Sequence, residues 1–355
     1  MSKTTTVPAG GVRLKKQREP ERFALIGVWI AVIIFFSFAT DRFMTEGNIS
    51  SLLGSQAVLL ILALGLLLPL RVGDFDLSVA STLGLSAMLV AILNVEHGWN
   101  VWLAALFAIL VGCVIGLVNG VVVVRWNINP FIVTLGMSTF IQGVIFWVSK
   151  SNTISGIDPV LSDFVLQETI FGVPADFWYA LIVAAVIWYV FEFTPLGQRF
   201  LFVGQSQDMA RLNGIAVSRT RVLALVASGG IAALAGVVLA GSTGSADPNS
   251  AASFLMPAFA ACFLGTTVLK IGRFNPWGTV IALYFIGTGT TGLQLLGAQN
   301  YVQQLFYGAA LIIAVILAEV LRKRNARRLQ NVARQAALAA AKSGDGSTSN
   351  TKDNA

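Results

Sequence analysis

Uncharged polar side chains recur at helical spacing in strongly apolar parts of this sequence. Thr134, Ser138 and Gln142 lie four residues apart, so on a helix they form one polar stripe. Hydroxyl and amide groups hydrogen-bond a hydroxyl-rich solute without holding it tightly, which a route across a membrane requires. The alternative is hydrogen bonding between helices, worth about 0.5–2 kcal/mol per contact. The residues that we expect to line such a route are Asn119, Asn129, Thr134, Ser138, Gln142, Thr288, Thr291 and Gln294.

Groups that catalyse reactions or hold metals are scarce. His97 is the single histidine, and Cys113 and Cys262 both fall in apolar stretches, which argues against a catalytic histidine cluster, a metal centre or a disulfide. The sequence has no HExxH, GxSxG or GxxxxGKS/T motif, so neither a hydrolase centre nor a nucleotide-binding loop of that kind is predicted. We therefore expect no catalytic residue, metal or cofactor. If ATP drives this protein, a partner must hydrolyse it.

The elements that must position the polar residues are long apolar segments. Of 355 residues, 55% are hydrophobic and 12% are charged, and the mean hydropathy of +0.75 is typical of an integral membrane protein. The segments lack the alternation of a β-barrel, and helices satisfy their own backbone polar groups in lipid. The sequence predicts an all-α fold of about ten transmembrane helices, at 23–39, 52–70, 77–94, 101–124, 130–148, 177–194, 221–241, 255–269, 277–296 and 301–321.

Basic residues divide the predicted loops into two classes. With the N-terminal tail in the cytoplasm, 22 of the 24 Lys and Arg fall on the cytoplasmic side, and Arg42 and Lys150 lie outside. This bias favours ten spans with both termini inside, so the net charge of +7 is a topology signal and no nucleic-acid partner is expected. The predicted parts are a cytoplasmic basic tail 1–22, a transmembrane domain 23–321 with an external loop 149–176 and a cytoplasmic loop 195–221, and a tail 322–355 that begins on anionic lipid headgroups and ends disordered.

Ionisable residues are nearly absent from the predicted helix interiors. Ion-coupled carriers commonly place such groups near the membrane midplane, and voltage sensors carry an Arg ladder, so the sequence disfavours both classes. Asp74 and Asp76 lie at the edge of the third helix. Asp76, close in sequence to Arg71, is a candidate for a gate or latch together with Arg71, or for a partner contact. An acid at a helix N-terminus is the simpler interpretation of Asp76.

The cytoplasmic loop contains a second candidate site. Residues 204–214 favour a short helix bounded by Gly204 and Gly214. Its apolar side chains beside a basic residue suit a groove on another protein, whereas an amphipathic helix resting on lipid headgroups is an equal alternative. The candidate residues for contact with a partner ATPase are Gln207, Asp208, Met209, Arg211 and Leu212.

Short motifs in a fixed order add a resemblance to these observations. They are Asp76-Leu77-Ser78-Val79, Asn119-Gly120, the run from Asn129 to Gly136, the run from Ala210 to Ile215, Leu264-Gly265-Thr266-Thr267, and the run from Gly292 to Gly297. From about residue 48 to 321 the chain resembles permeases of the ribose/xylose/autoinducer class of bacterial ATP-binding cassette (ABC) importers. It departs from their usual Gly-Gly-Ile-Asp-Leu-Ser at 73–78, where Asp74 and Phe75 add a carboxylate and an aromatic ring.

The resemblance implies a transport subunit of the bacterial inner membrane rather than an enzyme. Such permeases are similar in fold to the ten-helix cobalamin importer (type II), in which the loop between helices six and seven docks on the ATPase. The implied partners are a cytoplasmic ABC ATPase, a second permease copy or paralogue, and a periplasmic solute-binding protein that delivers a monosaccharide or related polyol. The alternatives are an ABC permease for branched-chain amino acids and a secondary carrier that needs no ATPase.

Overall fold

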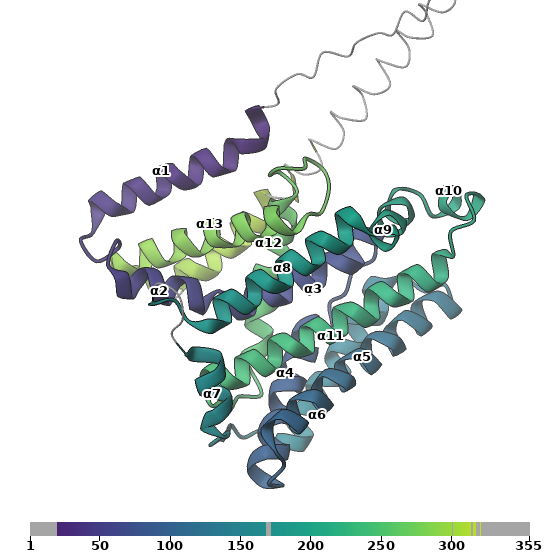
Figure 1. The fold of residues 1–355 in the computed structure, drawn as a ribbon, viewed down its shortest axis with the longest axis horizontal. Helices are drawn as coiled ribbons and strands as arrows, with labels where there is room; N and C mark the ends of the chain where they lie inside the picture. Colours follow the sequence, from purple (N-terminus) through teal and green to yellow (C-terminus); the bar gives the residue numbers. More distant parts are fainter. Residues whose placement is uncertain (1–19, 168–171, 300, 314, 317–319, 321–355) are drawn as a thin grey trace, which may run out of the picture.

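The computed structural model describes residues 20–167, 172–299, 301–313, 315–316 and 320 (Figure 1). The predicted tail 322–355 and nearly all of the tail 1–22 lie outside these residues. The first half of the described chain contains η1 (Pro20–Phe23), α1 (Ala24–Ala39), α2 (Glu46–Ser55), α3 (Ala57–Val72), α4 (Val79–Ala91), the π-helical turn η2 (Ile92–Glu96), α5 (Val101–Arg125), α6 (Pro130–Ser149), β1 (Ile154–Ser155) and α7 (Pro159–Leu166). The second half contains α8 (Ala175–Phe193), α9 (Pro195–Gln205), α10 (Gln207–Leu212), α11 (Val217–Thr243), β2 (Ser245–Ala246), η4 (Ser250–Phe254), α12 (Leu255–Gly265), α13 (Pro276–Leu295) and a last helix, Tyr301–Ile313.

Among the described residues, six helices are long and apolar enough to cross a membrane. They are Glu46–Val72, which joins α2 and α3, and Val79–Glu96, Val101–Arg125, Pro130–Ser149, Ala175–Phe193 and Val217–Thr243. The other four predicted segments also coincide with helices. Three of these are apolar but shorter (Ala24–Ala39, Ser250–Gly265 and Tyr301–Ile313), and α13 carries several Gly and Thr residues. The protein is therefore an all-α membrane protein.

Helices α5 and α11 lie side by side, as Figure 1 shows, and their contact depends on glycine. A Cβ atom on Gly112 would lie 2.5 Å from the carbonyl oxygen of Gly229, and one on Gly116 would lie 2.8 Å from the carbonyl carbon of Leu225. The Gly112, Gly116 and Gly120 face therefore allows the two backbones to approach closely, as small residues do between membrane helices.

The buried helix α3 ends at a glycine. All of its residues from Ala57 to Val72 are buried, and Gly73 follows with φ of +88°, a left-handed conformation that favours glycine. Pro69 and Leu70 supply the carbonyl groups that accept from the amides of Asp74 and Gly73, which closes the helix end. The chain then runs without regular helix over residues 73–78, the helix-break loop, before α4 begins.

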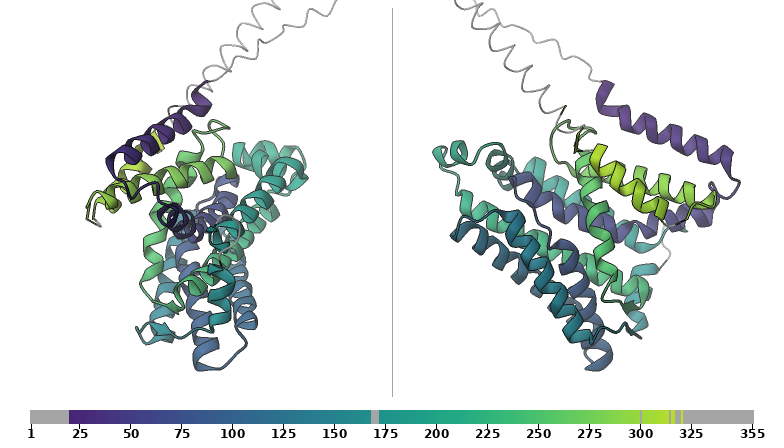
Figure 2. Two further views of the ribbon diagram at one scale, coloured as in Figure 1. Left: turned by 60° about the vertical axis from the view of Figure 1, so that its left-hand side comes forward. Right: turned by 180° about the vertical axis from the view of Figure 1, so that it is seen from behind.

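The remaining elements define the edges and ends of the bundle. Helices α1 and α13 lie on one edge, and α5 and α6 lie on the opposite edge (Figures 1 and 2). Helix α10 lies at one end and α7 at the other (Figure 1). Strands β1 and β2 pair antiparallel, with Ile154 opposite Ala246, and so join the segment after α6 to the segment after α11. The predicted external loop 149–176 thus contains a strand and a helix.

Candidate functional site

Asp74 of the helix-break loop and Arg221 of α11 form a buried ion pair. Nε and Nη2 of Arg221 donate hydrogen bonds of 2.8 Å each to Oδ2 and Oδ1 of Asp74. The residues are only 1% and 7% exposed. This bidentate geometry replaces the hydration that both charges lose on burial, whereas loss of either partner would leave a charge unpaired. The pair therefore fixes the loop to α11.

Asp76, in the same loop, is bound by uncharged groups. The backbone N–H and Oγ of Ser78 donate to Oδ1 of Asp76 at 3.1 and 2.6 Å, and Oγ of Ser228 on α11 donates to Oδ2 at 3.0 Å. Nδ2 of Asn119 on α5 in turn donates to Oγ of Ser78 at 2.9 Å. All four residues are buried. This network joins α5, the helix-break loop and α11.

Thr134 of α6 binds the backbone of the loop from the other side. Its Oγ1 accepts from the amide of Leu77 at 3.1 Å and lies within hydrogen-bond distance of three carbonyl oxygens, those of Phe75 (3.2 Å), Pro130 (2.8 Å) and Phe131 (3.5 Å). Thr134 is fully buried, and the Phe75 side chain is 39% exposed and stacks near Phe259. One hydroxyl thus fixes the segment that presents the Phe75 ring.

Two cavities lie along α6. On this helix, Thr134 lies between the residues that line the first cavity and those that line the second. The arginine cavity, of about 620 Å³, is lined by the start of α6 from Asn129 to Phe131, by the Asp74–Arg221 pair and by Gln207 of α10. The serine cavity, of about 390 Å³, is lined by Ala80, Ser81, Ser138, Thr139, Gln142, Phe146, Asn249, Ala252 and Leu255. Asn129 is exposed and caps α6, since its Oδ1 accepts from the amide of Phe131 at 2.9 Å.

Thr288, Thr291 and Gln294 lie on α13, at the other edge of the bundle. Thr288 is buried, accepts a 2.9 Å hydrogen bond from Nε1 of Trp29 on α1, and donates to the carbonyl of Tyr284. Gln294 is exposed and donates to Gln303 of the last helix at 3.2 Å. The predicted polar set therefore divides in two, and these three residues are not brought together with Asn119, Asn129, Thr134, Ser138 and Gln142.

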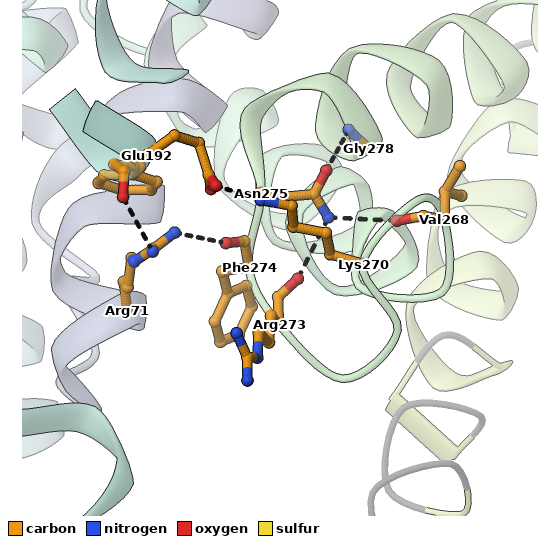
Figure 3. Close-up of polar contacts among 9 residues, drawn as sticks. Arg71, Glu192, Val268, Lys270, Arg273, Phe274, Asn275 and Gly278 are labelled. Atoms are coloured by element: carbon orange, nitrogen blue, oxygen red, sulfur yellow. Dashed lines mark hydrogen bonds and ion pairs between the residues drawn. The ribbon is translucent and has the colours of Figure 1, made fainter. Parts of the chain in front are cut away.

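Arg71 belongs to a different set of contacts from Asp76. Its guanidinium lies 4.1 Å from the centre of the Phe191 ring and donates to the carbonyl oxygens of Phe191 (3.4 Å) and Phe274 (3.2 Å). Figure 3 shows this arginine beside the ion pair between Lys270 and Glu192. Arg71 thus joins α3 to α8 and to the segment before α13.

Helix α10 presents its predicted contact residues to solvent. Ser206 caps the helix through its Oγ, which accepts from the amide of Met209 at 3.3 Å. Asp208 and Arg211 form an exposed ion pair of 3.4 Å, and Leu212 is 82% exposed. Met209 is also exposed, whereas Gln207 is half-buried at the arginine cavity.

Helix α9 connects this surface to α3. A Cβ atom on Gly204 would collide with the carbonyl oxygen of Arg71 and lie 3.1 Å from its carbonyl carbon. The two backbones therefore touch directly before the helix-break loop. Helix α9 is therefore packed against the backbone that leads into Asp74.

Residues 48–315, which contain the loop, both cavities and α10, match the family described as "Branched-chain amino acid transport system / permease component". The chain belongs to this permease family. It is a transport component and not an enzyme. Among the described residues, no group of three His, Cys, Asp or Glu side chains is placed to hold a metal ion.

Curated relatives align with most of the permease. It is 34% identical over 307 residues to the autoinducer 2 import system permease protein LsrD of Photorhabdus laumondii, covering 84% of this chain and 91% of the relative. It is 32% identical to the D-allose transport system permease protein AlsC of Escherichia coli, covering 83% and 90%. It is also 32% identical to the ribose import permease protein RbsC of Bacillus subtilis, covering 82% and 90%. No solved structure matches the permease.

The sequence did not indicate the ion pair of the permease. The sequence places Arg221 at the end of the predicted cytoplasmic loop 195–221 and indicates no partner for Asp74. The two residues are 147 positions apart, so no helical spacing joins them. The available signal was the carboxylate at 74 itself, because a charge beside an apolar helix requires a partner.

Proposed function

We propose that the permease is the membrane-spanning subunit of an ABC importer for a monosaccharide or a related polyol. The relatives above are named for import or transport of autoinducer 2, D-allose or ribose, and the alignments cover at least 90% of each. The hydroxyl and amide groups around the serine cavity suit hydrogen bonds to a neutral, hydroxyl-rich solute. ATP is hydrolysed by a separate subunit, because the permease sequence has no nucleotide-binding loop of the GxxxxGKS/T kind.

The proposal includes ten transmembrane helices in a type II, cobalamin-importer-like fold with both termini in the cytoplasm. Each of the ten predicted segments coincides with helical residues in the described chain. The distribution of 22 of 24 basic residues to one side supports the same topology. In this topology α10 is cytoplasmic and α7 is external.

We infer that the ATPase docks on α10. Its contacts are Gln207, Asp208, Met209, Arg211 and Leu212, of which Leu212 is the most exposed apolar side chain. Closure of the ATPase pushes α9 against the end of α3 and so biases the bundle between inward-open and outward-open states. The close contact of Gly204 with the Arg71 backbone supports this route.

The proposed pathway follows α6, with Asn129 at the arginine cavity and with Ser138 and Gln142 at the serine cavity. Asn119 and Thr134 are buried and bind the helix-break loop, so in this proposal they position the pathway residues without contacting the solute. A second permease copy or paralogue completes the route. This partner covers the exposed apolar side of α6, which includes Ile132, Phe140 and Trp147.

Uptake by whole cells tests the proposed function. The permease is expressed with its neighbouring ATPase and solute-binding protein in a host that lacks its own ribose and allose importers. Uptake of labelled D-ribose and D-allose is expected, and it is expected to stop when the ATPase is inactivated. Uptake that persists without the ATPase would indicate a secondary carrier. Uptake of leucine and not of either sugar would favour the amino acid class that the family description names.

A further inference from the structure

We propose that the serine cavity is a solute-contact site of the permease that selects among neutral hydroxyl-rich solutes. This proposal rests on the proposed function and adds the residues that make the selection. They are Ser81 of α4, Ser138 and Gln142 of α6, and Asn249 of the segment before η4, with the Phe146 ring beside them. The cavity of about 390 Å³ falls within the range of roughly 300–1,000 Å³ that is usual for small-molecule sites.

The hydroxyl groups of Ser81 and Ser138 form a hydrogen-bonded pair that can still bond to a ligand. Their oxygens are 2.7 Å apart, and either can donate to the other. One proton is enough for that bond, so the second hydroxyl keeps a proton for a ligand, and lone pairs of both oxygens remain. The pair can therefore donate to and accept from a ligand hydroxyl, which is itself both donor and acceptor.

Gln142 adds a fixed amide. Its Nε2 donates to the carbonyl of Pro248 at 2.8 Å, which orients the side chain and leaves Oε1 as an acceptor. The segment that carries Pro248 is itself tied down, because Asp247 accepts from Thr153 at 2.7 Å and from the amide of Asn249 at 2.8 Å. These hydrogen bonds hold the pKa of Asp247 below its usual value. The site is thus preorganised on both sides.

The remaining lining favours a neutral ligand. None of the described side chains that line the serine cavity is charged, so an anion or a zwitterion would lose hydration without gaining an ionic partner. The Phe146 ring offers an apolar surface to the C–H face of a sugar. Ala252, which also lines the cavity, belongs to the 3₁₀ segment η4 and adds a small apolar side chain.

Competition between two sugars tests the site in the complete importer. The probes are labelled D-ribose and D-allose, and the variants are Ser138→Ala and Gln142→Leu. Each variant is expected to raise the KM for uptake by about three- to tenfold through the loss of one hydrogen bond, and to change the ratio of allose to ribose uptake.

Ser37→Ala is the matched control, since Ser37 lies on α1 and its hydroxyl bonds only the carbonyl of Ile33 among the described residues. It should leave KM and selectivity unchanged. Suppose that Ser138→Ala and Gln142→Leu reach the membrane in normal amounts and still show the wild-type KM and selectivity. That result would overturn the solute site while leaving the importer function intact. If the wild-type importer carries neither of these sugars nor any other monosaccharide or polyol, the proposed function itself fails.

A second measurement does not depend on whether the Ser138 and Gln142 variants reach the membrane. Thr139 is exposed on α6 and lines the cavity, so Thr139→Cys can be labelled in a background in which Cys113 and Cys262 are replaced by Ser. An excess of D-ribose or D-allose is expected to slow its reaction with a small thiol reagent at least twofold. Leucine at the same concentration should not slow it. Equal rates with and without sugar would contradict binding in this cavity.

Discussion

The guanidinium of Arg221 binds both carboxylate oxygens of Asp74 at 2.8 Å, and this pair lies next to Gln207 of the proposed ATPase-docking helix. The same loop carries Asp76, which is held by Ser228. Two residues of α11 therefore fix the helix break between α3 and α4. In the proposed function, a shift of α9 and α10 acts on this break.

The first prediction concerns this pair. Asp74→Ala and Arg221→Ala each leave a buried charge without its partner, so each should destabilise the permease by about 3–5 kcal/mol. The double variant should be less destabilised than the sum of the two, because no unpaired charge remains. The measurement is the thermal unfolding midpoint of the detergent-purified protein.

The exposed ion pair of α10 provides the control for that experiment. Asp208→Ala and Arg211→Ala remove a pair whose side chains are 89% and 59% exposed, which should cost at most about 1 kcal/mol. If the variants at Asp74 and Arg221 were no less stable than these, the buried pair would not fix the loop.

The second prediction concerns the contact of α5 with α11. Gly116→Ala places a methyl group against the Leu225 carbonyl and 2.8 Å from the Cα of Val226, so the helices must separate. A destabilisation of about 1–3 kcal/mol is expected, measured as a lower thermal midpoint. Gly143→Ala on α6 is the control, since nothing lies within 4 Å of the added Cβ. Equal midpoints for the two variants would refute close packing at Gly116.

The sequence predicted the helices of this protein better than their contacts. Segment length and apolar composition locate a membrane helix because a helix satisfies its own backbone hydrogen bonds. The four-residue spacing of Gly112, Gly116 and Gly120 likewise falls on the face of α5 that contacts α11. Hydrogen bonds between side chains of different helices leave no periodic pattern in the sequence. The polar residues of α6 and α13 therefore looked alike in sequence, yet Ser138 faces a cavity whereas Thr288 bonds to Trp29.

The third prediction tests the docking role of α10. Leu212→Asp, and the charge reversal of Asp208→Arg with Arg211→Glu, alter exposed side chains without disturbing the core. Both should abolish co-purification of the ATPase and lower uptake at least tenfold, because a charge replaces an apolar contact or repels its former partner. Val160→Asp changes an equally apolar, exposed residue on α7 and should have no such effect. Retained ATPase binding in both α10 variants would place the docking surface elsewhere.

The fourth prediction concerns topology, on which the assignment of α10 to the ATPase depends. Single cysteines replace Asp163 on α7 and Asp208 on α10, in a background where Cys113 and Cys262 are replaced by Ser. Both positions are exposed, and their helices lie at opposite ends of the bundle (Figure 1). Because basic residues concentrate on the cytoplasmic side, an impermeant maleimide should label Asp163→Cys in intact spheroplasts and Asp208→Cys only in inverted vesicles. The cysteine-free protein should not be labelled in either preparation. Labelling of both cysteines from one side would mean that an even number of spans separates α7 from α10. If both were labelled in intact spheroplasts, α10 would lie beyond the reach of a cytoplasmic ATPase.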